Sequence, residues 1–198
     1  MDDENSRLKT LIQRVISRDQ DAAKEFIDLL YPQVARIVRS NLPSATDVED
    51  LTQEVFMKVF AKIDQCREVQ EVSHWVARIA VNTCYDRLRA QRVRRELRYS
   101  DLSLAQVEFL ENTLIDTSTT MESPAGGTRG IAKELIDQLI ATLKPNEQLV
   151  IRMLDLEQQS VAEISEITGW GASKIKVTAM RARQKLRKQL KLLEGTHW

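Results

Sequence analysis

The sequence contains few of the residues that form tight turns. Its 198 residues include only six Gly and four Pro, and 5% are aromatic. In contrast, 29% are charged and 42% are apolar, which is enough to build a core and excludes a wholly disordered chain. This composition favours an all-α protein.

Metal-binding and catalytic motifs are also lacking. Cys66, His74 and Cys84 match no strong zinc-ligand spacing, so we expect ordinary thiols in a reducing compartment. The segment AGGTRG at 125–130 lacks the strand and the Lys-Ser/Thr end of a phosphate-binding loop. No group of side chains suggests a catalytic arrangement. We therefore predict a protein without enzymatic activity, metal or cofactor.

Long apolar runs are absent as well. None approaches the length of a membrane span. The acidic beginning, MDDENSRLK, has no apolar core of the kind found in secretory signals. We expect a soluble cytoplasmic protein.

The charges cancel over the whole chain but not locally. There are 29 basic and 29 acidic residues. Residues 101–130 hold five acidic residues and one basic residue, whereas residues 131–198 hold eight acidic and 11 basic residues. The segment 169–188, GWGASKIKVTAMRARQKLRK, has seven Lys and Arg and no Asp or Glu. Local surfaces are therefore more informative than the net charge.

Hydrophobic periodicity and composition divide the chain into two helical units. The first unit, 1–100, is predicted to contain helices at about 7–16, 21–41, 47–64 and 73–98. Thr46 and Glu49 form a capping-box pattern before the third of these helices. Residues 101–130 are predicted to form an acidic, flexible linker rich in Ser, Thr, Gly and Pro. The second unit, 131–198, is predicted to contain helices at about 131–142, 146–156, 160–168 and 172–193.

The last two helices have the pattern of a helix-turn-helix. A short turn containing Gly169 separates them, and we expect Trp170 to plug it. The last helix has an apolar stripe formed by Ile175, Ala179, Ala182, Leu186 and Leu190. Its other faces are basic and suit a DNA major groove, although a solvated helix, a membrane surface or a partner's groove are alternatives.

A second basic face lies on the helix predicted at 73–98. The members recur at helical spacing and are Arg78, Asn82, Tyr85, Arg89 and Arg92. Arg side chains interleaved with an aromatic ring and an amide suit a nucleic-acid strand, because the cations hold phosphates and the ring can stack on a base. The alternative is an exposed face whose Arg side chains pair with acidic neighbours.

The chain resembles bacterial sigma factors of the extracytoplasmic-function (ECF) type. In the first unit, the resemblance is carried by DVEDLTQEVFMKVFAKID (47–64) and HWVARIAVNTCYDRLRAQRVRR (74–95). In the second, it is carried by LKPNEQLVIRMLDL (143–156) and AEISEITGWGASKIKVTAMRARQKLRK (162–188). The resemblance implies a subunit that binds RNA polymerase core, directs it to promoter DNA and is held inactive by an anti-sigma factor. It implies no small-molecule substrate.

The resemblance also implies roles for three groups of residues. The minus-35 element would be contacted by Ser173, Lys174, Lys176, Val177, Met180, Arg181 and Arg183. The minus-ten element would be contacted by Cys66, Trp75, Arg78, Asn82, Tyr85, Arg89 and Arg92. The clamp of the polymerase would be contacted by Asp50, Gln53, Glu54 and Lys58.

Some positions depart from the family pattern. Cys66 stands where an aromatic residue is common, and Gln148 replaces a frequent Arg that could contact a phosphate. Ser165 and Gly171 replace the usual Ala and a Ser-like cap of the helix-turn-helix, and Val177 removes a polar side chain from the recognition helix.

Two other functions agree with the same residues. The first is a helix-turn-helix regulator, either monomeric or dimeric, whose N-terminal unit senses a ligand or partner. It predicts symmetric binding of the isolated protein to a palindrome. The second is a helical adaptor with no role on DNA, whose basic faces are solvated.

Overall fold

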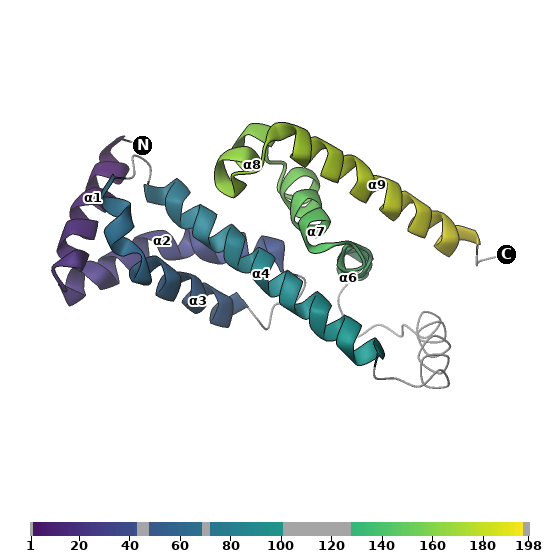
Figure 1. Cartoon of the computed structure of the whole chain (residues 1–198), viewed down its shortest axis with the longest axis horizontal. Coiled ribbons are helices and arrows are strands. Elements are labelled where there is room, and N and C mark those ends of the chain that lie inside the picture. The colour runs from purple at the N-terminus through teal and green to yellow at the C-terminus, as the bar shows by residue number, and fades with distance from the viewer. Residues whose placement is uncertain (1, 43–47, 69–71, 101–127, 196–198) are drawn as a thin grey trace.

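The computed structural model describes residues 2–42, 48–68, 72–100 and 128–195. Every regular element in these ranges is a helix, which confirms the all-α prediction. Figure 1 shows two groups of helices, with α4 running between them. The Thr46 cap and nearly all of the predicted linker 101–130 lie outside the described residues.

The N-terminal unit is a bundle around one apolar core. Its helices are α1 (Asp2–Ile16), α2 (Gln20–Asn41), α3 (Val48–Ala61), the short 3-10 helix η2 (Ile63–Glu68) and α4 (Val72–Ser100). Asp19 caps α2 by accepting a hydrogen bond from the backbone N–H of Ala22 at 3.1 Å. Phe26 and Leu51 are completely buried in the core that these helices share. The four predicted helices are confirmed, within a few residues at their ends.

The C-terminal unit is built from shorter helices and one long one. They are α6 (Thr128–Ala141), α7 (Pro145–Ile151), the π-helical turn η3 (Arg152–Leu156), α8 (Val161–Thr168) and α9 (Ala172–Gly195). Pro145 lies in the first turn of α7, where a missing N–H costs nothing. The single helix predicted at 146–156 is thus an α-helix that widens into a π-helical turn.

The predicted helix-turn-helix is formed by α8 and α9. Ser160 and Glu163 make a reciprocal capping box at the start of α8. Gly169 ends that helix with a φ of 73°, in the left-handed region that glycine adopts without strain. On α9, Ile175 and Ala182 are completely buried. The predicted stripe stops short of its last member, since Leu190 is 43% exposed beyond the end of the packed part of α9.

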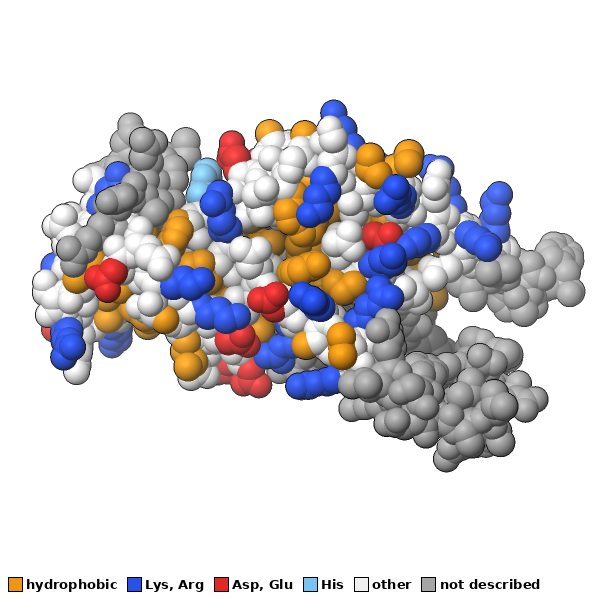
Figure 2. Space-filling model, in the orientation of Figure 1, with side chains coloured by type: hydrophobic (Ala, Val, Ile, Leu, Met, Phe, Trp, Pro, Cys, Tyr) orange, Lys and Arg blue, Asp and Glu red, His pale blue; other side chains and the backbone are white. Residues whose placement is uncertain are grey.

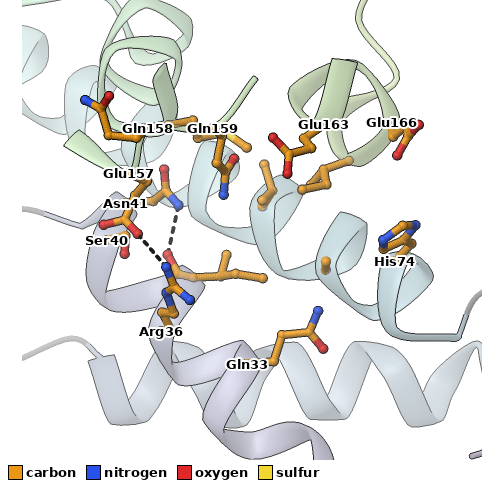
Figure 3. A pocket seen from close by; sticks show the side chains of 15 residues that line it. Gln33, Arg36, Ser40, Asn41, His74, Glu157, Gln158, Gln159, Glu163 and Glu166 are labelled. Carbon is orange, nitrogen blue, oxygen red and sulfur yellow. Dashed lines mark hydrogen bonds and ion pairs between the residues drawn. The ribbon is translucent and has the colours of Figure 1, made fainter. Parts of the chain in front are cut away.

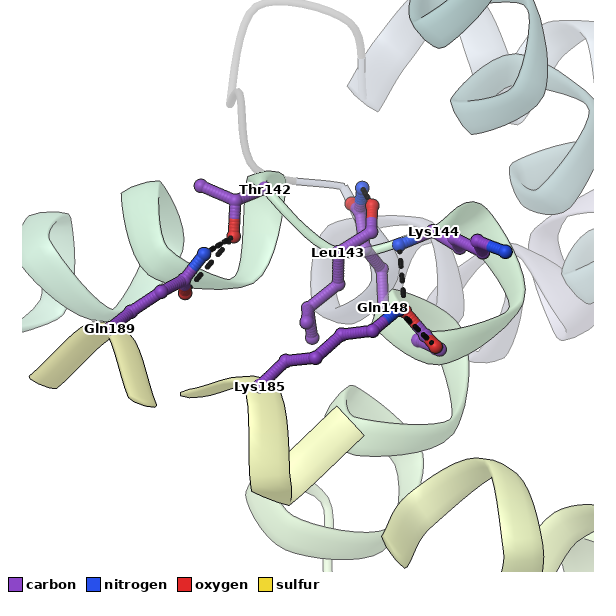
Figure 4. A network of polar contacts seen from close by, with 7 residues as sticks. Thr142, Leu143, Lys144, Gln148, Lys185 and Gln189 are labelled. Carbon is purple, nitrogen blue, oxygen red and sulfur yellow. Dashed lines mark hydrogen bonds and ion pairs between the residues drawn. The ribbon is translucent and has the colours of Figure 1, made fainter. Parts of the chain in front are cut away.

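Charged side chains inside the C-terminal unit join its helices. Glu147, which is 5% exposed, accepts from Lys185 Nζ on α9 at 2.7 Å and caps the backbone N–H of Lys144 at 3.0 Å. Nearby, Gln148 donates to the backbone oxygens of Ala141, the last residue of α6, and of Leu143 in the turn that follows (Figure 4). Gln148 is 6% exposed, so this position is part of the core and offers no surface contact to a phosphate.

The Glu147–Lys185 pair should make stability depend on pH. Burial raises the pKa of Glu147. The hydrogen bonds from Lys185 and from the backbone N–H of Lys144 together lower it by a larger amount, so the net pKa lies below the ordinary 4.5. A carboxylate with a lowered pKa stabilises the fold above its unfolded pKa, and this contribution is lost as pH falls through the folded pKa. We therefore expect stability to fall as the pH decreases from about 5 toward 3.

The variant Lys185→Met separates the contribution of the Glu147–Lys185 pair to stability from the contributions of other carboxylates. The variant should be less stable than the parent at neutral pH, because Glu147 keeps its burial and loses its counter-ion. It should also lose less stability on acidification. Urea denaturation at a series of pH values measures both effects, and Lys188→Met, an exposed position on α9, is the matched control. Parallel curves for the parent and Lys185→Met would show that the pair is not responsible.

The two units pack against each other along one surface, which we call the seam. It is formed by α2 and α4 of the first unit and by α7, η3 and α8 of the second. Ile37 and Val81 join the apolar cluster that contains Ile164 and Ile175. The first unit thus contributes apolar side chains to the core of the second unit. The seam therefore contains apolar contacts as well as polar ones.

Candidate nucleic-acid interface

The exposed face of α9 gathers most of the predicted minus-35 residues. Ser173, Lys176 and Arg181 are exposed, and so are two apolar members, Val177 (41%) and Met180 (52%). Neither Lys176 nor Arg181 forms an ion pair with any described residue. Figure 2 shows Lys and Arg side chains gathered over the part of the surface where α9 lies. Both cations are therefore available to an anionic partner.

Two other predicted members are held by neighbours within the protein. Arg183 makes two hydrogen bonds to the carboxylate of Asp155 in η3, at 2.5 and 3.1 Å. The Nζ atom of Lys174 lies 4.1 Å from the ring centroid of Trp170, as a cation–π contact. In this structure Arg183 and Lys174 link the recognition helix to the rest of its unit.

The second basic face lies on α4, and α8 and the turn after it contact one end of this face. The guanidinium of Arg78 donates to the backbone oxygen of Glu166 in α8 at 2.8 Å. The ring of Tyr85 meets that of Trp170 edge-on, with centroids 5.9 Å apart. Asn82, which lies between Arg78 and Tyr85, is exposed, and so are Arg89 and Arg92 farther along α4. The structure therefore brings the predicted residues onto one face, but α8 and the turn after it contact part of that face.

One predicted minus-ten residue lies in the core of the first unit, and a second packs against that core. Cys66 is 1% exposed, and burial raises the pKa of its thiol to about 11. Trp75 is half-buried and packs against the same apolar cluster. Cys66 belongs to the apolar core of this unit, and its contact with DNA stays a prediction.

The predicted polymerase-contacting residues share α3. Asp50 and Gln53 are exposed, and they lie near Met57, which is 67% exposed. Glu54 accepts from Lys58 at 2.8 Å and from Arg87 of α4 at 3.2 Å, and these bonds lower its pKa despite partial burial. Glu54 and Lys58 thus also tie α3 to α4.

Sequence reasoning missed the residues that link the two units. Trp170 was expected only to plug its own turn, and its contact with Tyr85 spans 85 positions. Arg36 pairs with Glu157 at 3.5 Å across the same seam. Helical spacing carries information about neighbours within one helix, so neither contact had a signal in the sequence.

Other kinds of site find no support in the described part of the chain. No group of His, Cys, Asp or Glu among those residues could hold a metal ion. No described helix is sufficiently long and apolar to cross a membrane.

Two helical units, one of which contains a helix-turn-helix, define an all-α protein of two units with a basic helix face on each. The Sigma-70 region 2 family matches residues 26–94, and the Sigma-70 region 4 family matches residues 133–186. The chain therefore belongs to the sigma-70 family of transcription initiation factors, in its ECF group. Members of this family are not enzymes.

Relatives match the chain over nearly its whole length. The ECF sigma factor SigW of Bacillus subtilis is 28% identical over 93% of this chain and 97% of its own length. SigF of Caulobacter vibrioides is 27% identical over 98% of this chain and its full length. The sigma-E factor of Escherichia coli K12 is 26% identical over 89% of this chain and 90% of its own length.

Solved structures share the fold at lower identity. CnrH, in complex with the cytosolic domain of CnrY, has a TM-score of 0.53 and 19% identity and covers 94% of this chain and 98% of its own. RpoE of Bartonella quintana, in complex with the anti-sigma factor NepR, also has a TM-score of 0.53, with 20% identity over 85% of this chain and 96% of its own.

Proposed function

We propose that this protein binds RNA polymerase core and directs it to promoters by reading a minus-35 and a minus-ten element. The observation that carries this proposal is the presence of two separate basic faces, on α4 and on α9, each within the region that matches the family. Two faces on two units suit two separated DNA elements, because tethering raises the effective concentration of the second contact.

In this proposal the minus-35 element is read by the first half of α9. The buried side chains of Ile175 and Ala179 anchor the helix, so Lys176 and Arg181 point away from the core. An α-helix fits the major groove, where cations reach phosphates and base edges. Val177 and Met180 offer apolar contacts, which suit the methyl group of thymine.

The minus-ten element meets the face of α4 that contains Asn82 and Arg89. Exposed bases can stack on or bond to an aromatic ring and an amide, while Arg side chains hold the strand. Tyr85 and Arg78 engage α8 and Trp170 in this structure. Full use of the face therefore requires the seam to open.

Polymerase docking is assigned to the exposed side of α3. Asp50, Gln53 and Met57 there combine charge, an amide and an exposed apolar side chain, a composition that suits a protein contact. Two structural neighbours are bound to CnrY and to the anti-sigma factor NepR, and an anti-sigma partner is proposed for this chain as well. These roles place the protein in the cytoplasm, with the polymerase.

Transcription with purified polymerase core tests the proposal. Core supplemented with this chain should initiate at a subset of promoters from the genome of origin, and core alone should not. Asp50→Ala with Gln53→Ala should reduce core binding while the circular dichroism spectrum stays unchanged. Tight binding of the isolated protein to a palindrome, with no initiation by the supplemented core, would instead establish the helix-turn-helix regulator.

A further inference from the structure

The recognition helix α9 has two kinds of cation on one face. Lys176, Met180 and Arg183 follow one another at spacings of four and three residues, so they lie along the same side of the helix. Lys176 is exposed and forms no ion pair with any described residue. Arg183, in contrast, donates to both carboxylate oxygens of Asp155, from Nε at 3.1 Å and from Nη2 at 2.5 Å. The face that we assign to the minus-35 element thus contains both free and neutralised cations.

The Asp155–Arg183 pair affects surface charge more than stability. Its two hydrogen bonds have the bidentate geometry that suits a guanidinium and a carboxylate. The Arg183 and Asp155 side chains are nevertheless 47% and 36% exposed. Ion pairs this open to water contribute little to the free energy of folding. The main consequence of the pair is therefore that the surface beside α9 presents one positive charge fewer to a ligand.

The π-helical turn η3 holds Asp155 beside α9. In this turn the backbone N–H of Glu157 donates to the backbone oxygen of Arg152, five positions earlier, at 2.9 Å. Gln158 has a φ of 56°, and its Nε2 donates to the backbone oxygen of Asp155 at 2.8 Å. Glu157 also pairs with Arg36 of α2 at 3.5 Å, as Figure 3 shows. The backbone around Asp155 is thus fixed by hydrogen bonds within the turn and by an ion pair to the first unit.

Neutralisation of Arg183 affects the binding of every DNA duplex. All duplexes present the same phosphates, and each cation that neutralises a phosphate adds affinity without sequence information. These contacts supply essentially all of the affinity for DNA that has no cognate site, whereas a cognate site also gains contacts to base edges. Because a genome offers a very large number of competing sites, a weaker attraction to all of them helps a protein to reach its few targets.

We propose that Asp155 limits the binding of this protein to DNA that lacks a minus-35 element, because it withholds the charge of Arg183 from phosphates. The inference rests on the proposed function, since it takes α9 to be the surface that meets DNA. Lys176 and Arg181 stay free to contact the element, and the Asp155 carboxylate adds repulsion of nearby phosphates. Asp155 is thus a specificity-determining residue that contacts no base.

Fluorescence anisotropy of the full chain with a labelled random duplex tests this role. At about 0.1 M salt, Asp155→Asn should tighten binding about fivefold to tenfold, because the freed Arg183 gains one phosphate contact. The slope of log K against log salt concentration should become steeper by about 0.9. Asp28→Asn is the matched control, the same chemical change at an exposed position on α2. It should leave the slope unchanged, because Asp28 pairs with no described cation.

The double variant Asp155→Asn with Arg183→Gln separates a freed cation from an altered fold. Both charges of the pair are then absent, so the salt slope should return to that of the parent. A slope that stays steep in the double variant would overturn the proposal. Weaker binding of Asp155→Asn to the random duplex would do the same, because it would show that Asp155 only braces α9. Unchanged affinity and slope in Asp155→Asn would also contradict it.

Titration of the parent with a minus-35 duplex keeps this inference distinct from the proposed function. Equal affinity of the parent for the minus-35 and random duplexes would count against the proposed reading of the element. A clear preference for the minus-35 duplex, with no effect of Asp155→Asn on the random duplex, would count against the role of Asp155 alone. Neither measurement contains polymerase, so both are independent of the transcription assay.

Discussion

Asp137→Ala is expected to lower the free energy of unfolding by about 3 kcal/mol. Its carboxylate accepts from Arg152 Nη2 at 2.7 Å, and the Arg152 side chain is only 4% exposed. Removing the partner leaves a buried guanidinium without its counter-ion. We expect the lower end of the usual range for a broken buried pair, because Asp137 itself is 20% exposed. Urea denaturation followed by circular dichroism measures the change.

The double variant Asp137→Ala with Arg152→Met is the control. It removes both charges, and an apolar side chain replaces the buried one, so most of the lost stability should return. A double variant as unstable as Asp137→Ala alone would show that packing around Arg152, and not its unpaired charge, causes the loss.

Lys176→Ala and Arg181→Ala are each expected to weaken binding to minus-35 duplex DNA by about 1–3 kcal/mol. This corresponds to a loss in affinity of roughly fivefold to 150-fold for each variant. Both side chains are exposed and make no ion pair with any described residue, so stability should be unaffected. Fluorescence anisotropy with a labelled promoter duplex, at fixed salt concentration, measures the change.

A matched control separates base reading from general attraction. Lys188 is exposed on the second half of α9, beyond the residues assigned to the major groove. Lys188→Ala should weaken binding to promoter and random duplexes equally, with a smaller salt dependence. If Lys176→Ala and Arg181→Ala also act equally on both duplexes, they contact phosphates and do not read the sequence.

The sequence was most informative where function depends on one helix. Lys176, Val177 and Met180 could be placed on the outer face of α9 because the buried stripe fixes which way a helix faces. Gly169 could be predicted to end α8 because few other residues adopt its backbone conformation. Leu190 was predicted to continue the buried stripe and is exposed, because periodicity does not show where the helices that pack against α9 end.

Contacts between distant segments could not be predicted in the same way. Cys66 followed a family position, but its burial depends on how η2 packs against α1. The spacing of residues along α9 does not distinguish Arg183 from Arg181. They differ because Asp155 of η3 lies beside Arg183 and bonds to it. A charge in a sequence does not reveal whether its partner lies inside the protein or in DNA.

The sequence by itself determined the helices, the helix-turn-helix and the two basic faces, because these follow from local spacing and backbone preference. Only the tertiary structure decided that the units pack through Ile37, Val81 and Trp170, so that part of the α4 face lies against α8. The reason is physical: packing of two amphipathic surfaces depends on their shapes in three dimensions, and residues 85 positions apart share no periodicity.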